Sequence, residues 1–201
     1  MRTFLPEDLS IKNWAQIETY FEDLNTRAID SVEDIKKWMQ DRNELEAVLE
    51  ENMAWRYIKM NIDTTDPELQ KSFQFFVQNI GPKIAPYAHG LNTKLINSKH
   101  LKDIDSVYYF IYLRDIKNAI NLYREENIPL FTELTNKAQK FGEISAQMMV
   151  QVDGKDQTLQ QASVHLKSID RDKRKAVFEL INARRTEDQT SLDVLLDELI
   201  A

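Results

Sequence analysis

The side chains that could carry metal-dependent hydrolysis are few in this chain. A helical zinc peptidase needs two histidines four residues apart on one helix face, with a glutamate between them that takes a proton from the metal-bound water. The histidines are His89, His100 and His165, and no two of them have that spacing. A His-Glu-x-x-His motif is therefore excluded, and we predict no metal ligand in this chain.

Other catalytic patterns are missing as well. A di-iron helical bundle would need a glutamate three residues before a histidine, but Pro86, Asn97 and Ala162 occupy these positions. The chain has no cysteine, no Gly-x-Ser-x-Gly segment and only 4 scattered glycines, so the usual nucleophile and phosphate-loop motifs are absent. We predict no catalytic and no cofactor-binding residue in this chain.

Two pairs of acidic residues are candidates for acid–base chemistry. Asp63 lies near Asp66, and Asp103 lies near Asp105, and paired carboxylates can act as acid and base in hydrolysis. Each pair also falls where a helix should begin or end, and aspartate is a favoured helix cap. We interpret both pairs as caps. A complete hydrolase that uses carboxylates alone stays open as a minor hypothesis.

Composition narrows the class of protein further. The 201 residues are 42% hydrophobic and 29% charged, with 4 Gly and 5 Pro, which is typical of a compact helical protein with one sizeable core. A net charge of -7 disfavours a nucleic-acid partner, because phosphate binding depends on a surplus of Lys and Arg. The basic runs Arg171–Lys175 and Arg184-Arg185 have acidic neighbours, and we interpret them as solvated helix faces.

The sequence also indicates the cellular compartment of the protein. The first residues contain no apolar run of signal-peptide length, and no segment approaches the ~20 consecutive apolar residues of a membrane span. The absence of cysteine fits a reducing compartment. We predict a cytoplasmic protein without a membrane partner.

Apolar residues at spacings of three and four predict helices through the first two thirds of the chain. These begin near Ser10, at Ser31 with Asp34 three residues later, and at Asp66 with Pro67 next. The second should run about thirty residues to about Ile62, and the third toward Ser98. The short Asp63-Thr64-Thr65 link should make these two long helices antiparallel.

Several details of this helical region can be predicted. Gly81-Pro82 and Pro86 interrupt the hydrogen-bond ladder, so a kink near Gly81 is expected. Further helices are predicted over Asp105–Tyr123 and Asn127–Lys140. Six aromatic residues at helical spacing should lie mostly in the core, although a few could line a peptide groove: Trp38, Trp55, Tyr57, Tyr108, Tyr109 and Tyr112.

The pattern changes at Phe141. Apolar residues alternate with a period of two from Ile144 to Val152, and Asp153-Gly154 is a strong turn signal. Thr158 with Gln161 and then Asp170 indicate two later helix starts. The fold class is therefore mainly α, with long antiparallel helices and one short β-hairpin near residues 144–157. An apolar stripe, Leu192, Leu195, Leu196 and Leu199, runs to the end without a cap, so we expect a chain that is cut rather than finished.

Two stretches carry a family resemblance. The first runs from Trp55-Arg56-Tyr57 through Asp63-Thr64-Thr65-Asp66-Pro67, and the second from Phe141 through Ile200. The most specific pieces are Val152-Asp153-Gly154-Lys155 leading into Thr158-Leu159-Gln160-Gln161-Ala162, then Asp170-Arg171 to Arg184-Arg185, and Leu192-Asp193 to Asp197-Glu198-Leu199-Ile200. In their order along the chain and in their residue types, these segments resemble the N-terminal half of the M3 metallopeptidases, in particular the oligoendopeptidase F branch. None of the pieces is a catalytic signature.

This resemblance implies a mainly helical enzyme in which this region forms one wall of a channel for short peptides. The zinc ligands and the general base would belong to the half that follows. We expect residues 1–201 to be a single helical N-terminal region of a longer zinc oligopeptidase, inactive alone because the catalytic domain is absent. Zinc would be the cofactor of the full-length parent, and an oligopeptide its substrate.

Two expectations about partners remain. The face that meets the missing domain should be apolar, so the chain could self-associate through it. The alternative to the peptidase hypothesis is a free-standing helical interaction or scaffold protein built around the Ser31–Ser98 hairpin, without catalysis.

Overall fold

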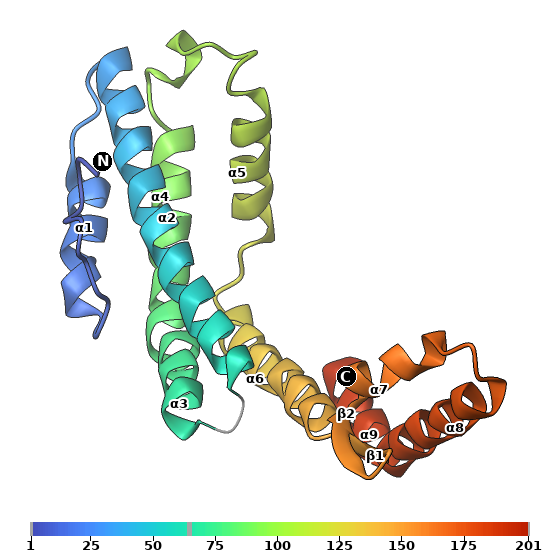
Figure 1. Cartoon of the computed structure of the whole chain (residues 1–201). Coiled ribbons are helices and arrows are strands. Elements are labelled where there is room, and N and C mark those ends of the chain that lie inside the picture. The colour runs from blue at the N-terminus through green and yellow to red at the C-terminus, as the bar shows by residue number, and fades with distance from the viewer. Residues whose placement is uncertain (1, 64–65, 201) are drawn as a thin grey trace. The chain divides into compact units, whose positions relative to one another are not determined.

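A computed structural model of the protein describes residues 2–63 and 66–200. The chain is 75% helical with one small two-stranded antiparallel sheet, which confirms the predicted mainly α fold (Figure 1). It divides into two compact units, Met1–Thr132 and Glu133–Ala201. Among the described residues, no helix is long and apolar enough to cross a membrane.

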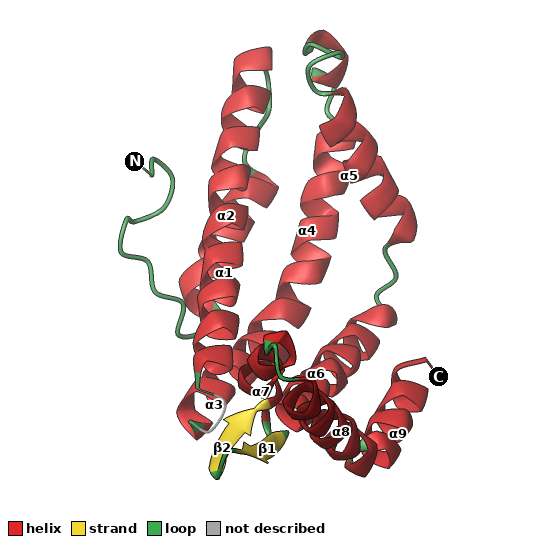
Figure 2. Cartoon of the chain, turned by 45° about the vertical axis from the view of Figure 1, so that its right-hand side comes forward, coloured by secondary structure: helices red, strands yellow, loops and turns green. Residues whose placement is uncertain are grey.

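The first unit contains most of the long helices. In chain order its elements are α1 (Ala15–Thr26), α2 (Val32–Ile62), α3 (Pro67–Phe75), a π-helical turn η1 (Phe76–Ile80), α4 (Gly81–Ile96), a 3-10 turn η2 (Leu101–Asp103) and α5 (Phe110–Leu122). The helix α6 (Asn127–Ala146) begins in this unit and ends in the second. Figures 1 and 2 show α2 antiparallel to the arm formed by α3 and α4, as predicted.

The helix α2 starts where the sequence predicts and supplies the centre of the core. The Ser31 hydroxyl oxygen accepts a hydrogen bond from the Asp34 N–H at 3.1 Å, which satisfies one of the free donors of the first turn. Trp38 is fully buried, and its indole N–H donates to the Leu24 carbonyl at 2.7 Å. This bond joins α2 to the end of α1 and leaves the buried indole without an unpaired donor.

Two polar contacts fix α2 against its neighbours. The buried carboxylate of Asp41 accepts from Arg27 and from Lys37, each at 2.6 Å. The next residue, Arg42, is also buried and donates to the Asn92 side chain of α4 at 2.7 Å. Since buried charges are costly unless paired, these bonds oppose any sliding of α2 along α1 or α4.

Two predicted helix starts were too early. The helix α1 begins at Ala15 rather than near Ser10, because the Gln16 side chain accepts from the Lys12 N–H at 2.7 Å and the Asn13 oxygen accepts from the Gln16 N–H at 3.2 Å. Such side-chain bonds hold the preceding residues in a turn. Likewise α5 begins at Phe110, since Asp105 accepts from two backbone N–H groups in a turn before it.

Where a kink near Gly81 was predicted, the structure has a π-helical turn, and α4 then continues through Pro86 without a break. The five residues Phe76–Ile80 form a π-helical turn, and the Gly81 N–H donates to the Phe76 carbonyl, five residues back. Pro82 follows with no N–H to donate. Of the predicted link before this arm, Thr64 and Thr65 lie outside the described residues. Asp66 accepts from the Glu68 N–H at 2.8 Å and caps α3 as expected.

The second unit is organised around the hairpin. Its elements after α6 are β1 (Met149–Val152), β2 (Lys155–Thr158), α7 (Leu159–Ser163), a 3-10 turn η3 (Val164–Lys167), α8 (Arg171–Glu187) and α9 (Gln189–Ile200). The strands pair antiparallel (Figure 2). The turn between them is Asp153-Gly154, both with positive φ, 52° and 77°, which is the turn geometry that matches strand twist. A small core joins the hairpin to α7 and α8: Met148, Val150, Val152, Leu159, Ala162, Val177 and Ile181.

The hairpin near residues 144–157 is confirmed, but its first residues were misplaced. Ile144 and Ala146 belong to α6, which ends at Ala146 rather than at Lys140. The helical bonding continues to the Gln147 N–H, which donates to the Glu143 carbonyl at 3.2 Å. Ile144 packs on the small core from this last helical turn, so its apolar character is compatible with a helix as well as a strand.

The later helix starts are confirmed. Thr158 and Gln161 form a capping box, and the Asp170 carboxylate accepts from the Asp172 and Lys173 N–H groups at 2.9 and 3.2 Å. These caps satisfy the free donors at the first turns of α7 and α8.

The predicted burial of the aromatic residues is only partly right. Trp38 lies in the core, and Tyr109 and Tyr112 pack against it while partly buried. The prediction is wrong for three others, Trp55, Tyr57 and Tyr108, which are 53%, 54% and 78% exposed. The apolar stripe of α2 is less covered in the C-terminal half of the helix, where Met60 is the one buried residue after Leu49.

Two glycines of the second unit allow a matched test of the turn. A Cβ added at Gly142 or Gly154 would meet no atom within 4 Å, but only Gly154 has a positive φ, 77°. Gly154→Ala should therefore lower the free energy of unfolding by about 1–2 kcal/mol, whereas Gly142→Ala within α6 should raise it by about 0.5–1 kcal/mol. Thermal denaturation of both variants checks this. Equal effects of the two substitutions would contradict the turn geometry.

Candidate functional site

The three histidines do not form a metal site. The His89 ring stacks on Tyr123 with centroids 4.1 Å apart, the His100 Nδ1 lies 3.5 Å from an Asp103 carboxylate oxygen, and His165 lies in η3. No group of three or more His, Cys, Asp or Glu residues that could hold a metal ion occurs in residues 2–63 and 66–200. The donor set that hydrolytic zinc requires is not assembled by the described part of the chain.

The two acidic pairs have structural partners. Asp66 caps α3, and Asp105 accepts from the Val107 and Tyr108 N–H groups at 2.9 and 3.0 Å. The capping interpretation is thus confirmed for Asp66, whereas Asp105 holds the turn before α5 and caps no helix. Asp103 instead lies against His100, and Asp63 terminates α2, where its N–H donates to the Lys59 carbonyl at 3.3 Å.

The basic runs also have acidic partners, as the charge pattern predicted. Lys173 pairs with Asp153 at 2.6 Å, and this ion pair holds the pKa of the Asp153 carboxyl below its usual value. Arg184 pairs with Glu187 and Asp188. These contacts account for the basic residues as part of an exposed, ion-paired helix face.

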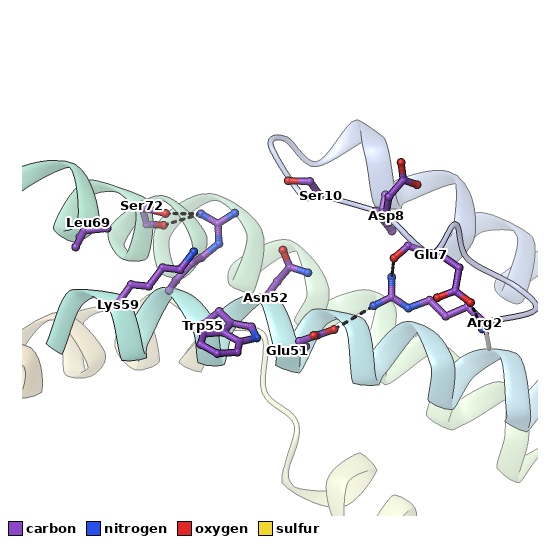
Figure 3. A pocket seen from close by; sticks show the side chains of 12 residues that line it. Arg2, Glu7, Asp8, Ser10, Glu51, Asn52, Trp55, Lys59, Leu69 and Ser72 are labelled. Atoms are coloured by element: carbon purple, nitrogen blue, oxygen red, sulfur yellow. Dashed lines mark hydrogen bonds and ion pairs between the residues drawn. The ribbon is translucent and has the colours of Figure 1, made fainter. Parts of the chain in front are cut away.

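A large cavity lies in the first unit, between α2, α3 and the residues before α1 (Figure 3). Its volume is about 660 Å³, within the range of small-molecule sites. Three segments line it: the N-terminal residues before α1, the C-terminal half of α2, and α3. The lining residues are Arg2, Glu7, Asp8, Leu9, Ser10, Glu51, Asn52, Trp55, Arg56, Lys59, Leu69 and Ser72.

Arg56 holds these three segments together. Its guanidinium donates to the Ser72 carbonyl at 3.1 Å, to the Ser72 hydroxyl oxygen at 2.7 Å and to the Ile11 carbonyl at 2.7 Å. It also lies over the rings of Phe75 and Phe76, with centroid distances of 5.8 and 5.6 Å. Burial lowers the pKa of the Arg56 guanidinium, which nevertheless stays charged at neutral pH. The shape of the cavity therefore depends on this side chain.

The N-terminal wall is held by charged side chains. The Arg2 guanidinium donates to the carbonyls of Pro6 and Glu7 and to the Glu51 carboxylate of α2, each at 3.0 Å. Nearer the start of α2, the Glu44 carboxylate accepts from the N–H groups of Thr3, Phe4 and Leu5 at 2.9, 2.9 and 2.7 Å. These bonds give an otherwise irregular segment a defined path.

Three side chains of α2 form a row along the cavity. Glu51, Trp55 and Lys59 are four residues apart, so they lie on one side of the helix. Figure 3 shows the Trp55 ring between the other two. Within the described residues the Lys59 ammonium makes no hydrogen bond or ion pair. Sequence reasoning missed this row because Trp55 was placed in the core, although the four-residue spacing was visible.

The second unit has an apolar groove of its own. Ala138 and Phe141 of α6 line it together with the α9 residues Leu192, Asp193, Leu195, Leu196 and Leu199, and its volume is about 400 Å³. Phe141 and Leu196 are 58% and 55% exposed. Lys137 flanks it with ion pairs to Glu133 at 2.8 Å and Glu198 at 3.7 Å. The leucine stripe predicted from the sequence thus forms a helix that is only partly covered.

Comparisons with known proteins identify relatives of this chain. A family model described as the peptidase M3 N-terminal domain matches residues 4–123. A protein of Bacillus anthracis strain Ames described as an oligoendopeptidase F has a similar structure, with a TM-score of 0.85 and 20% identity over 100% of this chain. A second structure described as an oligoendopeptidase F matches with a TM-score of 0.86 and 20% identity over 96% of this chain.

A third structure, PZ peptidase A with an inhibitor, matches with a TM-score of 0.84 and 17% identity over 96% of this chain. These identities establish similarity of fold. The chain spans 37%, 35% and 35% of the three solved chains, in the order given, or about a third of their length. No curated protein matches the chain.

The Glu44 contacts predict how the attachment of the N-terminal segment to α2 depends on pH. Burial alone would raise the pKa of Glu44, but hydrogen bonds from Thr3, Leu5 and Phe4 outweigh it and hold the pKa below the ordinary 4.5. Attachment of the N-terminal segment should therefore be complete above pH 4.5 and be lost as the pH falls through the lowered value. The protection factor of the Leu5 amide, which is the exchange rate of an unfolded peptide divided by the observed rate at the same pH, should therefore fall in acid before the protein unfolds.

The matched variant for this experiment is Glu44→Gln. An amide oxygen accepts more weakly than a carboxylate and does not titrate, so the protection factor of the Leu5 amide should be low at every pH. Protection of this amide that is independent of pH in the unsubstituted chain would show that Glu44 is not the anchor.

Proposed function

The chain belongs to the family described as the peptidase M3 N-terminal domain, and from this membership we propose that it is part of a zinc-dependent oligoendopeptidase. The single observation that carries the proposal is the family match over residues 4–123. The similar solved structures support it, since their fold extends over nearly all of this chain and continues in a larger remainder. Its reaction would be hydrolysis of peptide bonds in short peptides.

In this proposal the metal and the reacting groups belong to the rest of the protein. Hydrolytic zinc supplies an activated water and polarises the peptide carbonyl when bound. The residues of this chain do not fit such a site, because its histidines contact Tyr123, Asp103 or neither, and no metal-ligating cluster occurs in the part of the chain that is described. The role of the chain would be to bind and orient: it forms one wall of the channel that receives the peptide.

Exposed apolar side chains support a role in which another protein segment packs on this chain. Val107, Tyr108, Phe110, Ile111 and Leu122 of the first unit are 62–86% exposed. The groove of the second unit adds exposed Phe141 and Leu196. Exposed apolar side chains can mark an interface where they lie together, and in this proposal the catalytic portion of the same peptidase covers them.

Activity assays test this proposed function. The 201-residue chain, supplied with Zn²⁺ and a mixture of short peptides, should leave every peptide intact. The full-length gene product should cleave them and should lose activity when a chelator removes the metal. Cleavage by the isolated chain without zinc would overturn the proposal and favour a hydrolase based on carboxylates. A metal-independent full-length enzyme would contradict the zinc chemistry.

Sedimentation tests the uncovered groove. Without its partner domain, the isolated chain should self-associate through the groove between α6 and α9. Removal of the exposed Leu196 side chain from water is favourable. Leu196→Glu should shift it to monomer. Val164→Glu is the matched control, since Val164 is 63% exposed but does not line the groove. A chain that is monomeric at all concentrations would contradict this expectation.

A further inference from the structure

Arg56 carries a positive charge that no carboxylate of the described structure neutralises. Its Nη1 donates to the carbonyl and the hydroxyl oxygen of Ser72, and its Nη2 donates to the Ile11 carbonyl. These acceptors are neutral, and burial lowers the pKa of the guanidinium without a carboxylate to oppose the shift. A guanidinium has five N–H donors, so the Nε–H and one Nη2–H keep no partner within residues 2–63 and 66–200. A fixed cation with two spare donors therefore lies in the wall of the cavity.

Lys59 adds a second positive charge on the same side of the cavity. It follows Arg56 by three residues on α2, a spacing that places both side chains on one side of the helix, and it also lines the cavity. The Lys59 ammonium has no hydrogen bond or ion pair in the described part of the chain. Figure 3 shows the side chain extending from α2 toward the side of the cavity where Ser72 of α3 lies. The cationic end of the cavity, formed by Arg56, Lys59 and Ser72, thus has two cations without a counter-ion.

The carboxylates that line the cavity are directed elsewhere. Glu7, Asp8 and Glu51 are among the lining residues. The Glu51 carboxylate accepts from the Arg2 guanidinium, and the Glu7 carboxylate accepts from the Arg2 backbone N–H, each at 3.0 Å. Figure 3 shows these two glutamates on the Arg2 side of the cavity and Asp8 pointing away from Lys59. None of these carboxylates is therefore paired with the cations of the other end.

Hydroxyl groups add to the donors of the cationic end. The Ser72 hydroxyl oxygen accepts from Arg56 at 2.7 Å and donates no hydrogen bond among the described residues, which leaves its proton free to donate. Ser10 also lines the cavity, and it directly precedes Ile11, whose carbonyl accepts from Arg56 at 2.7 Å. The cationic end therefore offers donors of three kinds: guanidinium N–H groups, an ammonium and hydroxyls.

Donors of this number and charge suit an oxyanion with two negative charges. A phosphate group carries a charge of about −1.5 to −2 at pH 7 and several acceptor oxygens, and a guanidinium binds it through two N–H groups at once. A carboxylate carries a single charge and would leave one of the two cations unpaired. We propose that the cationic end of this cavity binds a phosphate dianion, with Arg56 and Lys59 neutralising its charge and the Ser72 hydroxyl donating to one of its oxygens. No bond is made or broken in this binding.

The cavity has room for more than a phosphate group. Its volume is about 660 Å³, and the ring of Trp55, four residues before Lys59, is 53% exposed in the same lining. Aromatic groups pack favourably on such a ring, so a phosphate ester with an aromatic substituent should make contacts that inorganic phosphate lacks. Both ligands present the same dianion. Binding of either one extends beyond the proposed peptidase function and does not rest on it, because the residues involved all belong to this chain.

Calorimetric titration of the 201-residue chain tests this site. At constant ionic strength and about pH 7, where phosphate is mostly a dianion, inorganic phosphate and phenyl phosphate should both bind. Acetate should bind about tenfold more weakly, since one charge-assisted contact is lost. Tighter binding of phenyl phosphate than of inorganic phosphate would assign an ester as the ligand, and equal binding would assign free phosphate. Absence of phosphate binding at millimolar concentration would overturn the proposal, as would acetate that binds as tightly as phosphate.

Lys59→Met is the decisive variant. It removes an ammonium that has no partner in the described structure, so the melting temperature should stay the same while the affinity for phosphate falls about tenfold. Arg56→Lys keeps the charge but removes the planar pair of N–H groups, and it should also weaken the binding of phosphate. Lys117→Met, which removes an exposed ammonium of α5, is the matched control and should bind phosphate like the unsubstituted chain. Equal affinities of the Lys59→Met and Lys117→Met variants would show that the site is wrong.

Discussion

The first unit depends on the packing of one long helix. α2 extends over 31 residues, and its N-terminal half is buried by α1 and α4 around Trp38. Its register is set by the bonds of Asp41 to Arg27 and of Arg42 to Asn92, because a shift of one turn would leave buried charges unpaired. The same register determines where the C-terminal half presents Glu51, Trp55 and Lys59. Core packing and the shape of the cavity therefore have a common origin.

The helix caps and the hairpin turn were predicted well from the sequence, since each depends on a few adjacent residues. Ser31, Asp66, Thr158 and Asp170 start helices as expected, and Asp153-Gly154 forms the hairpin turn. The sequence predicted less well which side chains are buried by elements distant along the chain. Periodicity shows that a helix has an apolar side but does not show which turns of it are covered, so the exposure of Trp55, Tyr57 and Tyr108 could not be foreseen. The start of α1 was misjudged because Ile11 and Trp14 are buried without being helical.

The cavity was not predicted because its walls are distant in sequence. Arg56 brings Ile11 and Ser72 together through backbone oxygens, and a bond to a main-chain carbonyl leaves no signature in residue type. The absence of a His-Glu-x-x-His motif, in contrast, follows from spacing alone, since no two of the three histidines are four residues apart. The proposed function is a division of labour in which the chain supplies binding surface and another part of the protein supplies chemistry.

The most direct measurement of this division is the nucleotide sequence downstream of the Ala201 codon in the source DNA. The account predicts an open reading frame that continues in the same frame and encodes a His-Glu-x-x-His segment. A stop codon in that position, with no such segment beyond it, would contradict the account and would leave a helical domain that must function without a catalytic half.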